Sequence, residues 1–374
     1  MNYWAHRIFN ALGDRYRSLD RGILYGAFLL MLFGVFLTFA ASPAVADRNQ
    51  WASFYFVKRH LFFLAPALGA LFFTALLSVP NVRRLARALL IVSLVLMAAV
   101  LVFGADIKGA RRWIVLFGIT IQPSEFVKPA FAVVAAWWLA SGRLINQSRG
   151  YWKAVALFAV VCGLLFCQPD IGMLLTIAAV FCVQLFLSGI PVVFAGALGG
   201  FFAGLLAGAY FFFDHVRVRV DRFLNPAREE TYQVAKSMET LKNAGWFGKG
   251  PGEGVVKYEL PDAHTDFIMA VSAEEFGFIV TALLVCVFIF IVLRGYALVC
   301  RENNYFSQIA VGGLLTQIAF QAIVNMGSTL NLLPTKGMTL PLISYGGSSL
   351  VSMGIAFGII LALTHGRSLS RGLE

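Results

Sequence analysis

Long apolar runs alternate with short polar segments along the 374 residues of the chain. A helix needs about 20 apolar residues, each adding about 1.5 Å, to cross the hydrocarbon core of a bilayer. The sequence therefore predicts an all-α integral membrane protein with about ten transmembrane helices. The expected spans are 23–41, 61–79, 86–104, 123–141, 153–167, 171–188, 191–213, 267–293, 308–330 and 343–364.

No repeat and no low-complexity linker divides the chain, so residues 1–374 are interpreted as one polytopic domain. The run 23–41 is longer than the roughly 7–15 apolar residues of a signal peptide, so we expect it to be kept as the first span. An even number of spans places the tails 1–22 and 365–374 on one side of the membrane. The short basic loops "NVRRLAR" and "SGRLINQSRGYWK" lie on that side. The positive-inside rule identifies it as cytoplasmic.

Composition supports a membrane location and narrows the partners. Hydrophobic residues make up 59% of the chain and charged residues only 13%, with a net charge of +11. In such a protein the positive charge points to anionic lipid or an anionic substrate. The sequence has no array of basic and aromatic residues and no arginine-rich tail, so nucleic acid is excluded as a partner.

The longest segment outside the apolar runs is 214–266, between the seventh and eighth spans. Loops longer than about 15 residues are usually functional or disordered. Within it Val234, Met238 and Leu241 recur at helical spacing, which predicts a short amphipathic helix on the outer membrane interface, ended by Gly245. Aromatic side chains suited to the headgroup zone follow, at Trp246, Phe247 and Tyr258.

The stretch "DIKGARRWIVLFGITIQPSEFVK" (106–128) carries candidate chemistry. Lys108, Arg111 and Arg112 form either a cationic mouth for phosphate or an anchor to lipid headgroups, since arginine matches phosphate oxygens bidentately. Glu125 and Lys128 follow inside the fourth span. Ionisable groups there are usually functional or paired, so these two either bind substrate or pair with each other.

Two proline-containing turns lie at other span boundaries. In "QPDIG" (168–172), Asp170 is expected to cap the helix that follows. The stretch "LPTKGMTLPLISYGGSS" (333–349) resembles a re-entrant or cavity-lining loop, because irregular backbone at membrane depth is tolerated only inside protein or along a cavity. Its cation, Lys336, is a candidate to face the same anion as Arg111.

The stretch "PDAHTDFIMAV" (261–271) places titratable groups just before the eighth span. Three interpretations stand: Thr265 or Asp266 caps the helix, His264 and nearby acids bind a metal, or a carboxylate acts as general base. Glu274 and Glu275 follow within two turns, where they can orient the loop.

With "KGARRWI", "QPSEFVK", "QPDIG", "LPDAHTDFI", "EEFG" and "LPLISYGGSS" in this order, the chain resembles the SEDS family (shape, elongation, division and sporulation). The stretch "PTKGMTLPLISYGGSS" is more similar to the division branch than to the elongation branch. The resemblance implies a ten-helix glycosyltransferase that polymerises lipid II during septal cell-wall synthesis. It also implies that Asp266 is the essential aspartate. The family often has glutamate where this chain has Asp262, which retains the acid.

The implied reaction uses Asp266 as general base and fixed cations to stabilise the departing pyrophosphate. The candidate substrate-binding residues are Arg59, Lys108, Arg111, Arg112, Glu125, Lys128, Lys336 and Ser344. No cofactor is required by the sequence and no metal-ligand spacing is present, although a divalent cation (Mg²⁺ or Mn²⁺) can share the charge stabilisation.

The resemblance further implies a class B penicillin-binding protein transpeptidase and other divisome proteins as partners, in the bacterial inner membrane at the septum. A lipid II flippase and an elongation-type polymerase remain the alternatives. A flippase should carry polar groups through the bilayer and often shows inverted repeats.

Overall fold

The computed structural model describes residues 18–48, 50–107, 110–116, 118–144, 148–190, 232–260, 262–333 and 337–364, with single positions elsewhere. Most of the expected seventh span, most of the N-terminal tail, the whole C-terminal tail 365–374 and the candidate cations Lys108 and Lys336 therefore lie outside the described residues. The division of the chain into domains stays a prediction.

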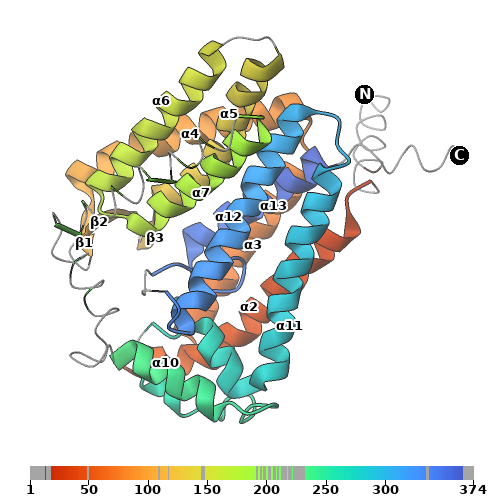
Figure 1. Cartoon of the computed structure of the whole chain (residues 1–374). Coiled ribbons are helices and arrows are strands. Elements are labelled where there is room, and N and C mark those ends of the chain that lie inside the picture. Colours follow the sequence, from red (N-terminus) through yellow and green to blue (C-terminus); the bar gives the residue numbers. More distant parts are fainter. Residues whose placement is uncertain are drawn as a thin grey trace, which may run out of the picture.

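The described part of the chain has ten α-helices, of which nine pack side by side as a bundle and α10 lies across one end (Figure 1). They are α2 (Arg21–Arg48), α3 (Tyr55–Ala75), α4 (Val79–Phe103), α5 (Pro123–Leu144), α6 (Ser148–Cys167), α7 (Ile171–Leu187), α10 (Tyr232–Asn243), α11 (Ile268–Val299), α12 (Tyr305–Thr329) and α13 (Gly347–Leu363). A 3₁₀ turn, η1, covers Val256–Tyr258.

The expected membrane-spanning architecture is confirmed. Nine of the ten expected spans correspond to a described helix, and α2, α3, α4, α6, α11 and α12 each contain a stretch long and apolar enough to cross a membrane. Two shorter apolar helices, α7 and α13, complete the apolar set, and α5 has 22 residues.

The boundary between α3 and α4 lies earlier than the apolar runs predict. α3 ends at Ala75 and α4 begins at Val79, with Pro80 in its first turn. Arg83 and Arg84 lie in the first turns of α4, and the guanidinium of Arg83 lies 4.0 Å from the ring centroid of Phe306. A cation over an aromatic face is stabilised, which helps to accommodate this charge in the helix bundle.

A small antiparallel sheet is the part of the fold that the sequence did not predict. It consists of β1 (Ala105–Ile107), β2 (Ala110–Leu116) and β3 (Ile119–Ile121) in the order β1-β2-β3, between α4 and α5. Leu116 pairs with Ile119 across a turn in which Gly118 has φ +76°. The basic residues between α4 and α5 thus lie on an ordered hairpin, which fixes the directions of its arginines.

The amphipathic helix expected in the 214–266 segment is confirmed as α10, which Figure 1 shows across one end of the bundle. Its most buried side chains are small and polar. Ser237 and Thr240 are fully buried, and the Ser237 hydroxyl donates to the carbonyl of Thr329 at the end of α12. Gly245 ends this region with φ +63°, and Trp246 and Phe247 are largely exposed, as the headgroup interpretation requires.

Among the described helices, α3 and α13 share the most extensive contact and lie along each other. Gly354 and Gly358 of α13 face α3 so closely that a methyl group would clash with the carbonyls of Ala67 and Leu71 respectively. Small residues permit such backbone approach between membrane helices. The glycines of the seventh span, Gly196, Gly200, Gly204 and Gly208, have no described neighbour within 4 Å of such a methyl group.

The α3–α13 contact can be tested by adding one methyl group. Gly358→Ala should destabilise the bundle by about 1–3 kcal/mol, since the new atom collides with fixed backbone and with Thr74. Gly69→Ala on the same α3 meets nothing within 4 Å and serves as the control. Thermal unfolding in detergent micelles measures both variants, and equal stability of the two would contradict the predicted packing.

Candidate active site

Two irregular segments meet at the end of the bundle where α11 and α13 begin. The Ser344 hydroxyl donates to the carbonyl of Thr265 at 2.6 Å, and it accepts from the backbone N–H of Leu340 at 2.8 Å. The N–H of Tyr345 donates to the carbonyl of His264 at 3.0 Å. These bonds satisfy backbone groups that no helix can satisfy, so each segment holds the other in place.

Asp266 lies at this junction. Its carbonyl accepts a hydrogen bond from the Asn325 side chain at 2.9 Å, and the same amide nitrogen donates to the carbonyl of Met338 at 2.7 Å. A carboxylate oxygen of Asp266 lies 3.4 Å from the position that a Cβ would occupy on Gly337. The predicted carboxylate and the residue that follows Lys336 in the chain are therefore neighbours.

The helix-capping interpretation of Asp266 finds no support at the N-cap position itself, which is Phe267 and makes no side-chain capping hydrogen bond. The side chain of Asp266 is half-buried rather than enclosed. Its role as general base stays a prediction.

Arg59 is placed near the same junction. Its guanidinium donates to the Tyr55 hydroxyl at 2.9 Å and to the carbonyl of Gly118 in the hairpin at 2.6 Å. Arg59 thus joins α3 to the hairpin.

The metal-binding interpretation of His264 has no support in the local donor set. The His264 ring is buried, 4.1 Å from the ring of Phe56 and 5.3 Å from the ring of Tyr345. Among the residues that the structure describes, no group of three or more His, Cys, Asp or Glu side chains lies close enough to hold a metal. These residues do not form a cage for a divalent cation, so no catalytic step is assigned to one.

Strand β2 sends the side chains of Arg111 and Arg112 to opposite faces. The cationic mouth that these residues would form with Lys108 stays a prediction. Arg111 is exposed and pairs with Asp106 in the strand register. Arg112 donates to the carbonyl of Gln168 at 3.0 Å and to that of Pro169, and lies 3.9 Å from the carboxylate of Asp170. Arg112 therefore fastens the hairpin to the turn between α6 and α7.

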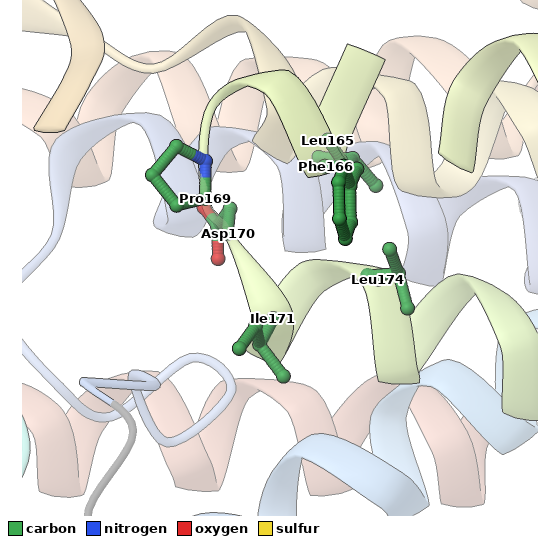
Figure 2. A pocket seen from close by; sticks show the side chains of 6 residues that line it. All are labelled: Leu165, Phe166, Pro169, Asp170, Ile171 and Leu174. Atoms are coloured by element: carbon green, nitrogen blue, oxygen red, sulfur yellow. The ribbon is translucent and has the colours of Figure 1, made fainter. Parts of the chain in front are cut away.

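The expected cap of α7 is confirmed, because the Asp170 carboxylate accepts from the N–H of Met173 at 3.3 Å. Figure 2 shows Asp170 beside Pro169 at the edge of a shallow pocket whose other labelled side chains are apolar. The Asp170 carboxylate is engaged by the cap, by Gln122 and by Arg112, so the side chains that line this pocket include no polar group available for catalysis.

Glu125 and Lys128 pair with each other at 2.7 Å inside α5. Both side chains are buried, and the Glu125 carbonyl accepts from the Ser352 hydroxyl of α13. The structure therefore shows the mutual pair, one of the two sequence alternatives. Their role in binding substrate stays a prediction.

Asn325 is the residue of the site that sequence reasoning missed. It lies within the apolar run of the ninth span, where a buried amide is costly unless it is bonded. That signal was weak, because Gln317, Gln321 and several hydroxyl side chains interrupt the same run. Its partners, the carbonyls of Asp266 and Met338, are 59 and 13 residues away, so no local sequence pattern indicates them.

Comparisons with known proteins agree with this arrangement. The family model of the FtsW, RodA and SpoVE cell cycle proteins matches residues 20–369. The probable peptidoglycan glycosyltransferase FtsW of Caulobacter vibrioides is 40% identical over 358 residues, which cover 96% of this chain and 92% of that protein. Its counterpart from Trichlorobacter lovleyi is 36% identical over 370 residues, covering 95% and 96%.

Solved structures show the same fold. A chain from the structure described as "Structural coordination of polymerization and crosslinking by a peptidoglycan synthase complex" has a TM-score of 0.75 at 29% identity, covering 92% of this chain and 97% of that one. Thermus thermophilus RodA has a TM-score of 0.67 at 28% identity, covering 94% and 98%.

Fold and full-length relatives define the class of this protein as a multi-pass, membrane-embedded glycosyltransferase. Within that class the chain belongs to the SEDS family of FtsW, RodA and SpoVE cell cycle proteins, as its motifs indicate.

The buried pair in α5 gives a stability prediction. Lys128→Met should destabilise the protein by about 3–5 kcal/mol, because Glu125 is left buried without its countercharge. Lys128→Met combined with Glu125→Gln removes both charges and should recover most of that loss. Thermal unfolding in micelles measures each variant, and a single variant as stable as the parent would show that the pair carries no energetic weight.

Proposed function

We propose that this chain polymerises lipid II into glycan strands, with Asp266 as the general base. The observation that carries the proposal is the position of the Asp266 carboxylate. It lies beside Gly337, and the backbone carbonyl of the same residue is held by Asn325. The full-length relatives named as peptidoglycan glycosyltransferases support the substrate class.

The reaction we propose is a single displacement at a sugar carbon. The carboxylate of Asp266 accepts the proton from the 4-hydroxyl of the acceptor N-acetylglucosamine. That oxygen forms a bond to the anomeric carbon of the lipid-linked donor chain, and the bond from this carbon to the pyrophosphate oxygen breaks. Undecaprenyl pyrophosphate leaves with the electron pair. Cleavage of the bond between the sugar and the pyrophosphate therefore drives the step, and no nucleotide is consumed.

Cations near the junction stabilise the charge that develops on the leaving group. Arg59 is supported best, since it fastens the hairpin to α3, the helix that packs along α13. Lys336 precedes Gly337 in the chain, and the exposed Arg111 is available at the hairpin surface. Arg112 acts indirectly by fixing the hairpin to the turn before α7. Ser344 shapes the segment through its bond to Thr265.

We further propose that the enzyme works at the outer face of the bacterial inner membrane, at the septum, with both termini in the cytoplasm. Its partner would be a class B penicillin-binding protein, a transpeptidase that crosslinks the new strand, together with other divisome proteins. A structural relative from a synthase complex that combines polymerization and crosslinking supports such a pairing.

Asp266→Asn tests the base directly. The amide cannot accept the proton, so lipid II polymerisation should fall by at least about 100-fold, as expected on loss of a general base. Asp262→Asn is the matched control: Asp262 lies in the same segment at φ +54°, a conformation that asparagine tolerates. Purified protein, with and without its transpeptidase, is given lipid II, and glycan length is read on a gel.

Sustained polymerisation by a folded Asp266→Asn protein would refute the assignment of the base. Translocation of lipid II across vesicles without any polymer, by the parent protein, would instead support the flippase alternative.

A further inference from the structure

Helix α11 is interrupted ten residues after it begins. Gly277 has φ +80° and ψ 179°, which is not helical, and the chain resumes its helix at Phe278. A break of this kind leaves carbonyls before it and N–H groups after it without helical partners. Inside a membrane protein these groups need other partners.

Residues 245–250 supply those partners. The N–H groups of Lys249 and Gly250 donate to the carbonyls of Glu274 and Glu275 at 2.8 and 3.0 Å. On the other side of the break, the N–H of Phe278 donates to the carbonyl of Gly245 at 3.0 Å. One loop therefore caps both the segment before the break and the helix after it.

Two glycines allow this contact. Gly248 has φ +76°, and a methyl group on it would clash with the carbonyl of Glu275. A methyl group on Gly277 would clash with the backbone of Trp246 and Gly248. Both positions need glycine for conformation and for space, so the fit of the loop into the break is built into the sequence.

The side chain of Glu274 anchors the rest of the loop. One carboxylate oxygen accepts from the N–H groups of Val255 and Val256 at 2.8 and 2.9 Å, and the other accepts from the N–H of Lys257 at 3.1 Å. The side chain is fully buried. Successive N–H groups that surround a carboxylate form a strong, directional anion site, which here is filled by the protein itself.

Lys257 and Glu275 complete the contact with a buried ion pair. The Lys257 ammonium contacts the Glu275 carboxylate and also donates to the carbonyl of Gly252 at 3.2 Å. Both side chains are at most 1% exposed. Because removing one partner leaves the other charge buried and uncompensated, this pair should strongly resist opening.

The locked segment leads directly to Asp266. Residues 268–275 form a helix whose side chains are all buried, with the loop at its far end and Asp266 just before its start. At the near end, Asn325 holds the carbonyl of Asp266. The segment is thus fixed at both ends, and a shift at the loop would move the carboxylate.

We propose that Glu274, Glu275 and Lys257 form a positioning latch, in which the loop 245–257 locks the first part of α11 and thereby sets the place of the Asp266 carboxylate. The inference rests on the proposed role of Asp266 as base. None of the three latch residues is required to touch substrate, so they act on the rate through geometry alone.

Lys257→Met is the direct test, and Lys249→Met is its matched control. Lys249 is also a loop cation, but it is about one-third exposed and lies 3.5 Å from Glu274. In Lys257→Met the kcat for lipid II polymerisation should fall by about 100-fold, the effect of a displacement of roughly 1 Å at a reacting group, with little change in KM. Lys249→Met should keep the parent kcat.

Hydrogen–deuterium exchange separates the latch from general instability. In Lys257→Met the amides of 249, 250 and 255–257 should exchange faster, since their N–H groups make the latch bonds, whereas peptides from α5 and α12 should keep the parent rates. Glu274→Gln is the second variant, and it leaves the buried ion pair in place. It should show the same pattern of exchange, and it replaces Lys257→Met as the test if that variant does not fold.

Two outcomes would overturn the latch: faster loop exchange with an unchanged kcat, or a loss of kcat accompanied by faster exchange throughout the bundle. Asp266→Asn keeps this test separate from the proposed function. If that variant retains activity, the base assignment fails. If it is inactive while Lys257→Met and Glu274→Gln polymerise normally with an opened loop, the latch alone fails.

Discussion

The amide of Asn325 is the interaction on which the site depends. One nitrogen at the end of α12 bonds two carbonyls, those of Asp266 and Met338, which belong to the two irregular segments of the bundle. Backbone outside helices cannot stay unsatisfied in a membrane protein, so these segments must find partners in each other. The bond from Ser344 to Thr265 continues the same junction. The position of Asp266, the candidate base, therefore follows from the need of these backbone groups for hydrogen-bond partners.

Most of the bundle could be predicted from sequence, because lipid demands long apolar helices and leaves a clear pattern. The errors arose where tertiary contacts decided the structure. Arg83 lies within α4 rather than in a loop before it, and its guanidinium lies over Phe306, more than 200 residues away in the chain. The sheet escaped prediction because β1 and β3 have only three residues each, and the apolar residues of β2 resemble an ordinary apolar run.

The site was predictable in its residue types but not in its geometry. Asp266 was placed by its motif, and its neighbour Gly337 follows the cation that the sequence also selected. Arg111 and Arg112 looked like a pair, yet a strand turns adjacent side chains to opposite faces, so only Arg111 stays exposed. Asn325 was hidden because its partners are distant in sequence.

Comparison of the acidic groups explains why Asp266 differs from them. Asp170 caps α7, Glu125 pairs with Lys128, and Glu274 is surrounded by three backbone N–H groups. Each of these carboxylates is buried and stabilises a helix or loop. The backbone carbonyl of Asp266 is held by Asn325, and its side chain is half-buried at the junction of the two irregular segments. A fixed backbone and a partly accessible carboxylate suit the role of general base that we propose for Asp266.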